Sequence, residues 1–523
     1  MKKTPTVAYR QRLPWLLLPL SVLLLVALAA CAPGLLNPPR EAAELPGAPP
    51  TSEPMVMRAP TPTGEPYLGQ VAPPSGDGNP TLTLWVEKPT ARYEGALREL
   101  IDTFTARHQI SIELVTVPPE LLPDLVTTAA TTTTFDLPDV VLAPLEYIPG
   151  WEEQGILDAE AATAILEELG PDSFDQEALQ LVSRGGQVAA IPSDGWQQLL
   201  LYREDWFEEK DLPAPTDFEA MLTAAEVISD RTNLIYSFNM PTESSLVATT
   251  RAFEQMAIAN GCQLIDDKGE LLILEDVCRD ALDYYRFLCN SYCPPGVQTE
   301  VSALNAYLSG RAGFIVATPW ALAAIAGLDD DYRPTCPDCS TPGYLAENTG
   351  LVTTIEGRSA QASPQNLGVM TYLGITTAAN TEAASTFAHF WFDEGYVDWL
   401  AIEPARKVPM RLGTPDEPER FLETWFELPL AGSDESIADL FGQEFAETLA
   451  TDVVNANRWG YTQGEGALIT TIFEDLTLSI LLQELLSGYY DADRAAIEGY
   501  KRLVELIPDY EYYFDPEPTP ENP

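Results

Sequence analysis

The cysteines are the side chains with the most chemical potential in this sequence, which has seven of them and only two histidines. Four form two close pairs, Cys289-x3-Cys293 and Cys336-x2-Cys339. Such spacings are compatible with a four-thiolate zinc site, and Cys336-Pro-Asp-Cys339 also has the spacing of a thiol redox motif. No strand-to-helix pattern surrounds that second pair, so the pattern favours a structural disulfide that clips a loop.

Cys31 stands apart from the other six because it closes an N-terminal run of basic, then apolar, then small residues. That order is typical of a secretory signal peptide. The junction Leu28-Ala29-Ala30-Cys31 resembles the lipobox of bacterial lipoproteins, in which the cysteine receives a diacylglycerol and becomes the new N-terminus. A retained transmembrane helix is the alternative, since about 18 apolar residues can just span a bilayer. Both interpretations place the rest of the chain outside the cytoplasm.

We therefore predict that residues 1–30 are a lipoprotein signal peptide and that lipidated Cys31 anchors the protein to the outer face of the bacterial cell membrane. An even set of thiols then remains, which in an oxidising compartment indicates disulfides. The sequence does not choose among the alternative pairings, and we expect neighbours to pair. The six candidates are Cys262, Cys278, Cys289, Cys293, Cys336 and Cys339.

The sequence offers little material for catalysis. His108 and His389 both lie in predicted amphipathic helices, which disfavours a Ser-His-Asp or His-metal centre. Phosphate-cradling and dinucleotide-binding glycine motifs are also missing. We predict that the protein is not an enzyme and takes no cofactor and no metal. A surface glycoside hydrolase is the enzymatic alternative, because two carboxylates suffice for that chemistry, but 79 acidic residues produce candidate pairs by chance.

The composition of the chain limits the classes of partner that it can bind. The 523 residues are 46% hydrophobic, enough for two ordinary domains. The formal net charge of −50 repels phosphate backbones, so nucleic acid is excluded as a partner. We interpret the acidity as a solvated surface that keeps an exported protein soluble, and we expect a monomer.

Hydrophobic patterns indicate an α/β fold. Residues 81–86 and 110–115 alternate as strands and 93–108 have helical spacing, which makes a βαβ unit and predicts a parallel sheet. Further strands are expected at 139–142, 187–192, 199–202 and 368–375, and helices at 218–228, within 272–313, at 381–391 and over most of 404–507. The Pro-rich residues 31–79 predict a flexible linker, and 508–523 an acidic disordered tail.

Several segments, taken in order, resemble the extracellular solute-binding proteins of ABC importers, in the sugar-binding, maltose-binding-protein-like group. The resemblance covers residues 80–480. Its segments are Leu82-Thr83-Leu84-Trp85, Pro138-Asp139-Val140-Val141, Gly186 to Pro192, Leu201 to Phe207, Leu212 to Phe218, Tyr307 to Gly313 with Pro319-Trp320, and Gly374-Ile375 ahead of Asn380.

The resemblance implies a two-lobed periplasmic-binding-protein-like fold of type II. Each lobe would be a mainly parallel sheet flanked by helices, and the chain would cross between them several times. One lobe would hold 80–191 with 368–403, and the other 192–345 with 410–507. The implied function is capture of a small solute, a sugar or oligosaccharide, between closing lobes, and its delivery to ABC permease subunits. A binding lipoprotein that serves a sensor is a further alternative.

The resemblance also implies where the ligand contacts lie. Sugar sites combine aromatic platforms with carboxylates and amides that bind hydroxyl groups. The most intact family motif ends at Trp320, whereas Arg406 and Arg411 are expected to pair with the surplus of surface acids. The predicted ligand-binding residues are Glu87, Tyr147, Asp194, Trp196, Trp320, Trp459 and Tyr461.

Overall fold

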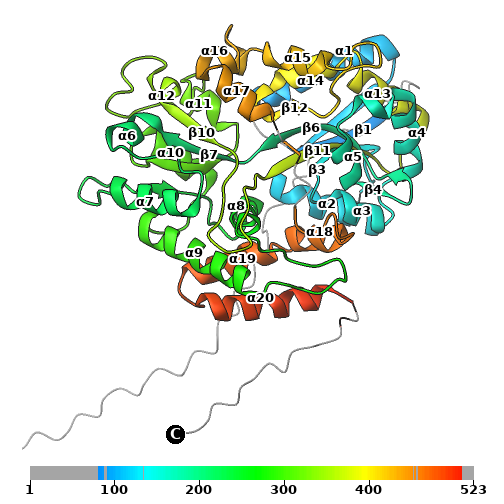
Figure 1. Cartoon of the computed structure of the whole chain (residues 1–523). Coiled ribbons are helices and arrows are strands. Elements are labelled where there is room, and N and C mark those ends of the chain that lie inside the picture. Colours follow the sequence, from blue (N-terminus) through cyan, green and yellow to red (C-terminus); the bar gives the residue numbers. More distant parts are fainter. Residues whose placement is uncertain are drawn as a thin grey trace, which may run out of the picture. The chain divides into compact units, whose positions relative to one another are not determined.

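The βαβ unit predicted from the sequence opens the first sheet of the computed structural model (Figure 1). Strand β1 (Thr81–Glu87) pairs parallel with β2 (Ser111–Val117) and with β3 (Val140–Pro144). Helix α1 (Ala91–His108) joins β1 to β2 and buries its helically spaced apolar residues, from Leu97 to Phe104, against the sheet. This part of the fold is confirmed as predicted.

The structure describes residues 81–87, 91–133, 135–451, 453–454, 458–508 and 510. The predictions for the signal peptide, for Cys31, for the linker 31–79 and for most of the tail 508–523 lie outside these residues. Within the described part, no single helix is both long and apolar enough to cross a membrane, although two consecutive helices bent by 57°, α18 (Gly466–Glu474) and α19 (Thr477–Leu486), pass that test together.

Three later strands complete the first sheet in the order β12-β6-β11-β3-β1-β2. They are β6 (Ile191–Gln197), β11 (Gly368–Ile375) and β12 (Val408–Pro409). Strand β11 runs antiparallel to β3 and β6, and β12 runs antiparallel to β6. The sheet is therefore parallel at the predicted βαβ unit and antiparallel where the chain re-enters it from the second sheet.

The second sheet has the order β10-β7-β9-β8. Its strands are β7 (Leu199–Arg203), β8 (Phe238–Asn239), β9 (Phe314–Ala317) and β10 (Thr349–Val352). Strand β7 is antiparallel to both neighbours, and β8 pairs parallel with β9. Two sheets, each with its own helices, confirm the two-lobed α/β architecture. The expectation that each sheet is mainly parallel is wrong, because among the described residues three of the five strand pairs in the first sheet and two of the three in the second are antiparallel. A small ribbon, β4 (Ser183–Arg184) with β5 (Gln187–Val188), completes the strands.

The chain passes from the first sheet to the second between β6 and β7, and it returns to the first sheet between β10 and β11. Only Gln198 separates β6 of the first sheet from β7 of the second. The side chain of Gln197 accepts a hydrogen bond from Asn366, which precedes β11, at 2.9 Å, and donates to the carbonyl oxygens of Thr448 and Leu449 at 3.1 and 3.2 Å. Three segments far apart in the sequence are thus held together between the lobes, which confirms a multi-crossing connection.

Helices late in the sequence cover both sheets. Helix α15 (Arg420–Phe426) contacts α14 (Tyr396–Ile402) and β12, beside the first sheet. Figure 1 shows α19 and α20 (Ala492–Leu506) near α8 (Val247–Ala259) and α9 (Asp276–Tyr292); α19 contacts both of these helices, and α20 contacts α9. The remaining helices are α2 (Leu122–Thr131), α4 (Ala159–Leu169), α5 (Gln176–Leu181), α6 (Glu204–Glu209), α7 (Phe218–Ile228), α10 (Glu300–Leu308), α11 (Ala321–Ile325), α12 (Tyr344–Glu347), α13 (Thr381–Phe392), α16 (Ile437–Phe441) and α17 (Gln443–Ala450).

Helix α18 packs unusually closely on α3 (Ile148–Glu153). The backbone N–H of Gly150 donates to Thr470 Oγ1 at 3.0 Å. A Cβ atom at Gly150 would lie 2.4 Å from the Thr470 methyl carbon, so the contact requires a glycine. This close approach joins the C-terminal helices to the helix that follows β3.

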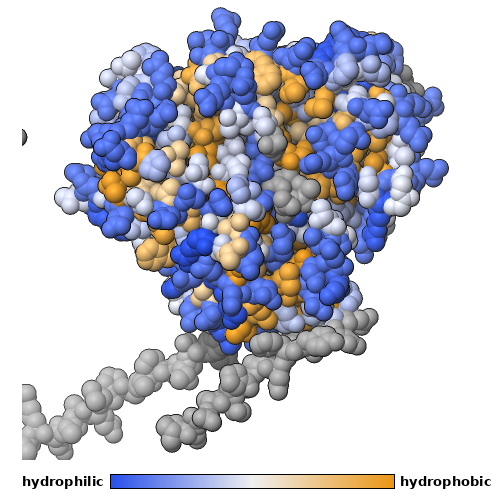
Figure 2. All heavy atoms as spheres, viewed as in Figure 1, coloured by the Kyte–Doolittle hydropathy of each residue, from blue (hydrophilic) through white to orange (hydrophobic). Residues whose placement is uncertain are grey.

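Three disulfides join neighbours in the sequence, Cys262 to Cys278, Cys289 to Cys293 and Cys336 to Cys339. The predicted neighbour pairing is confirmed, and it leaves none of these six thiols for the four-thiolate alternative. The bonds lie on and around α9 and in the loop after α11, on the side of the second sheet. Figure 2 shows a mostly hydrophilic face with scattered apolar residues, as the acidic composition predicts.

Candidate ligand-binding site

A cavity lies at the carboxyl ends of β1 and β3, between β6 and the segment that follows α14. Its free volume is about 40 Å³, which is room for a few water molecules. Three predicted ligand-binding residues, Glu87, Asp194 and Trp196, line it together. Strand pairing brings them there, because Glu87 ends β1 while Asp194 and Trp196 lie on β6, and both strands belong to the first sheet.

The two carboxylates have different environments. Asp194 Oδ2 accepts hydrogen bonds from Ser193 Oγ and from Trp399 Nε1, both at 2.7 Å. The half-buried carboxylate of Glu87 forms no hydrogen bond or ion pair with a described residue. Burial raises the pKa of Glu87, against the fields of Arg251 and Arg406. Glu87 is therefore an available acceptor, whereas Asp194 is already oriented by two donors.

Two adjacent cations line the same cavity. The Lys407 ammonium lies 3.5 Å from the ring centroid of Trp399 and 4.8 Å from that of Tyr93. Desolvation lowers the pKa of Lys407 to about 8, against the fields of Asp194 and Glu403. The Arg406 guanidinium lies 3.8 Å from Glu403, which is beyond hydrogen-bond distance.

The expectation that Arg406 and Arg411 pair with surface acids has a mixed outcome. Arg411 forms an ion pair with Asp393 at 2.6 Å and donates to the Phe392 carbonyl. Arg406 instead lines the cavity, because the Pro404–Arg406 turn directs this crossing segment toward β6.

Trp196 is only 3% exposed. The guanidinium groups of Arg251 and Arg406 each lie 5.7 Å from its ring centroid. In this arrangement the ring contacts cations, and a sugar could stack on it only after those groups move. Its role as a sugar platform stays a prediction.

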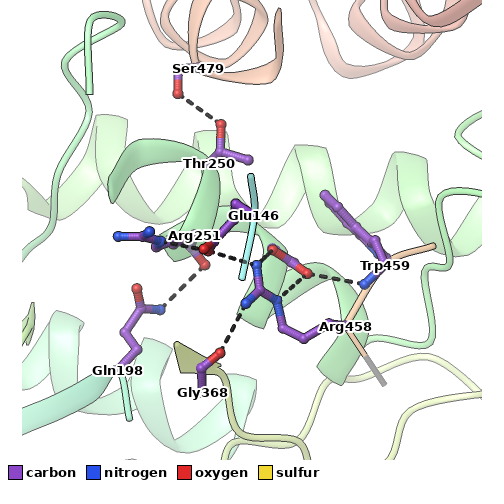
Figure 3. A network of polar contacts seen from close by, with 9 residues as sticks. Glu146, Gln198, Thr250, Arg251, Gly368, Arg458, Trp459 and Ser479 are labelled. Carbon is purple, nitrogen blue, oxygen red and sulfur yellow. Dashed lines mark hydrogen bonds and ion pairs between the residues drawn. The ribbon is translucent and has the colours of Figure 1, made fainter. Parts of the chain in front are cut away.

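Beside the cavity, a buried ionic network connects the two lobes (Figure 3). Arg458 donates to both oxygens of Glu254 on α8 at 2.8 and 3.0 Å, to Glu146 at 3.1 Å and to the carbonyl of Gly368 at 2.9 Å. Arg251, also on α8, donates to Glu146 at 2.9 Å. Glu146 follows β3 and Gly368 begins β11, so the first sheet is tied to a helix of the second lobe.

The network is electrically balanced, with two arginines and two glutamates. Burial alone raises the pKa of Glu146, but the nearby Arg251 and Arg458 lower it to about 2. Glu146 Oε2 is buried and has no hydrogen-bond partner within the described residues. These contacts tie the two lobes to each other.

The other predicted ligand-binding residues do not line this cavity. Tyr147 is buried and stacks on Trp151 at 5.6 Å. Trp459 is buried and donates from Nε1 to the carbonyl of Cys262 at 2.9 Å. The buried Tyr461 has a hydroxyl without a partner in the described residues, and half-buried Trp320 packs edge-on against Tyr332 at 5.6 Å. Their ligand contacts remain predictions.

Sequence reasoning missed Tyr93, Trp399, Glu403 and Lys407, which come from α1, α14 and the crossing that follows α14. Glu403, Arg406 and Lys407 lie close together in the sequence, but the local pattern does not show that this segment is buried, so they carried no usable signal. The described part of the chain also has a larger groove, about 800 Å³, between α10 and residues 330–335, which includes none of the predicted site residues.

The family model of the bacterial extracellular solute-binding proteins matches residues 99–419, and the chain belongs to this family. Proteins of this family act outside the cytoplasm, as predicted for this chain. The chain is 24% identical over 280 residues to the putative ABC transporter periplasmic-binding protein YcjN of Escherichia coli strain K12. That match covers 52% of this chain and 60% of the relative, so the chain spans about 60% of the relative's length.

Solved structures share the fold. The maltose-bound MalE3 of T. maritima has a TM-score of 0.63 at 18% identity, and covers 82% of this chain and 100% of its own. A solute-binding protein of Thermotoga lettingae TMO bound with alpha-D-tagatose has a TM-score of 0.62 at 20% identity, with the same coverages. The GacH receptor of Streptomyces glaucescens has a TM-score of 0.60 at 17% identity, covering 83% of this chain and 100% of its own. The predicted fold, that of type II periplasmic binding proteins, is confirmed.

Proposed function

We propose that this protein captures a sugar or oligosaccharide between its lobes and delivers it to the permease subunits of an ABC importer. The observation that carries the proposal is the cavity of the first lobe, where the free acceptor Glu87 and the oriented acceptor Asp194 face the donors Arg406 and Lys407. A polyhydroxylated solute needs both acceptors and donors at close range. Two structures of similar fold support the solute class, because one is bound to maltose and the other to alpha-D-tagatose.

The buried network supports a hinged mechanism. Because β6 and β7 are separated by one residue and the network ties Glu146 to α8, rotation about the crossing would open the cavity and break these contacts. We retain the proposed lobe boundaries, 80–191 with 368–403 and 192–345 with 410–507, with three changes. We place 192–197 with the first lobe, because β6 belongs to the first sheet, and 346–352 with the second lobe, because β10 belongs to the second sheet. We also place 410–426 with the first lobe, because α15 contacts α14 and β12.

Attachment through lipidated Cys31, a monomeric state and the lack of catalysis belong to the same proposal. The lack of catalysis is supported by the family, whose members bind solutes. A glycoside hydrolase would convert the bound sugar, whereas a binding protein releases it unchanged. A sensor-coupled lipoprotein would bind the sugar equally well, and stimulation of transport by a reconstituted permease separates it from an importer component.

Thermal unfolding of the full chain in detergent, with a panel of sugars, tests the proposal. We expect saturable stabilisation by at least one sugar, which chromatography then recovers unchanged. Glu87→Gln should weaken this effect, while Glu160→Gln, which removes the same charge from an exposed position on α4, should not. No stabilisation by any sugar, or turnover of the bound sugar, would contradict the proposal. Trp320→Ala tests that predicted contact separately.

A further inference from the structure

Lys407 differs from the other fully buried cations of the described residues. Arg203, Arg411 and Arg458 each have a carboxylate oxygen at 2.5 to 2.8 Å. Lys407 is 5% exposed, and no carboxylate of the described residues lies within 4.0 Å of its ammonium nitrogen. In a chain with 79 acidic and 29 basic residues, an unpaired buried cation is not explained by a shortage of carboxylates.

The surroundings of Lys407 stabilise it only in part. The rings of Trp399 and Tyr93 attract the ammonium through cation–π contacts, but they do not replace three N–H···O hydrogen bonds. Asp194 contributes a favourable field, yet its Oδ2 is engaged by Ser193 and Trp399. Burying a charge without a close counter-charge is costly. The Lys407 ammonium therefore lacks a nearby acceptor that would compensate its charge.

Arg406 has the same deficit in the same cavity. Its Nε is buried and has no hydrogen-bond partner within the described residues. Its one ion pair, with Glu403, is 3.8 Å long. Two consecutive cations therefore present unused N–H donors to one cavity that Trp196 and Glu87 also line.

We propose, on the basis of the proposed function, that the bound sugar is acidic. Lys407 and Arg406 would bind its anionic group, a carboxylate or a phosphate. Hydrogen bonds between charged partners are stronger than those to neutral hydroxyls, and an anion would supply the counter-charge that the cavity lacks. The hydroxyl groups of the sugar would then donate to Glu87 and Asp194. Lys407 and Arg406 act as specificity-determining residues.

The carboxylates that line the cavity give the argument for the competing outcome, in which the preferred sugar is neutral. Glu87, Asp194 and Glu403 all line it, and together they exceed the two cations by one charge. If their combined field already compensates Lys407, an added anion would be repelled and a neutral sugar would bind as well or better. The charge of the preferred sugar decides between the two.

The experiment measures affinities of the full chain, in detergent, by titration calorimetry. The probes are glucose, galactose and mannose, each with its uronate and its 6-phosphate, together with the neutral disaccharides maltose and cellobiose. We expect one acidic form to bind about tenfold or more tightly than its neutral parent. A preference for the uronate or for the 6-phosphate identifies which anionic group the site takes.

Lys407→Met and Arg406→Gln should each remove most of that preference while any neutral-sugar affinity persists. Arg406 is the second test because its side chain is 25% exposed, so the variant folds more readily than one at a fully buried position. Lys268→Met removes the same charge from an exposed loop and should preserve the preference.

The outcomes separate the two proposals. A neutral sugar that binds as tightly as its acidic forms, or a preference that survives both substitutions, overturns the acidic-sugar inference and leaves the sugar-binding function standing. Binding of no sugar of either kind overturns both.

Discussion

Replacement of Arg458 by methionine should destabilise the protein strongly. Arg458 is fully buried, and its guanidinium makes four hydrogen bonds to Glu254, Glu146 and Gly368. After the substitution Glu146 keeps Arg251, whereas Glu254 keeps the backbone N–H of Trp459 at 3.1 Å. Removing one partner of a buried ion pair costs about 3–5 kcal/mol, a large share of the total stability of about 5–15 kcal/mol typical of proteins.

Urea unfolding of the full chain at pH 7, followed by tryptophan fluorescence, measures the loss. Because most of the cost comes from the stranded charge of Glu254, adding Glu254→Gln to Arg458→Met should recover at least about 1 kcal/mol. Arg184→Met is the matched control, since Arg184 is 69% exposed in its ion pair with Glu153 and should cost only about 0–1 kcal/mol. A loss for Arg458→Met no larger than that of Arg184→Met, or a double variant with fully additive losses, would refute the reasoning.

Three further predictions concern stability. The pKa of Lys407 is about 8 in the folded protein, against 10.5 in the unfolded chain, so the unfolded chain binds more protons between these pH values. The free energy of unfolding of wild type should therefore rise by up to about 3 kcal/mol relative to that of Lys407→Met as pH rises from 8 to 10.5. A difference in urea midpoint that is constant with pH would contradict this. Gly150→Ala should cost about 1–3 kcal/mol, because its Cβ would meet a side chain of α18 at 2.4 Å. Gly95→Ala on α1 meets nothing within 4 Å and should leave thermal stability equal or slightly higher. Replacing Cys262 and Cys278 by serine should cost about 3 kcal/mol in thermal unfolding, given their separation of 16 residues, and an unchanged transition would show that this disulfide does not stabilise the fold.

Local patterns were sufficient for much of the fold. The alternation in β1 and β2 and the helical spacing in α1 are properties of neighbouring residues, and these elements form as predicted. The neighbour pairing of the cysteines was expected, although the sequence does not choose among the pairings, and it agrees with the low entropic cost of closing short loops. Strand β11 was recognised as a strand, but its antiparallel direction in the first sheet depends on where the chain re-enters it. The short strands β8, β9, β10 and β12 were not predicted.

The candidate site was predictable only in part. Glu87, Asp194 and Trp196 were found because they follow recognisable strands and family segments, and the first sheet brings them to one cavity. Lys407 and Trp399 carry no such local signal. They reach the cavity because β12 pairs with β6, a contact between segments about 200 residues apart, which no local pattern encodes.

Sequence alone determined the class of this protein, since ordered short segments with an exported, acidic composition were enough to indicate a two-lobed extracellular binding protein. The tertiary structure decided which charges meet. Arg458 reaches Glu146 and Glu254 across hundreds of residues, whereas Lys407 is buried with no carboxylate within ion-pair distance among the described residues. The physical reason is that secondary structure follows from neighbouring residues, whereas the compensation of a buried charge depends on which distant segments pack around it.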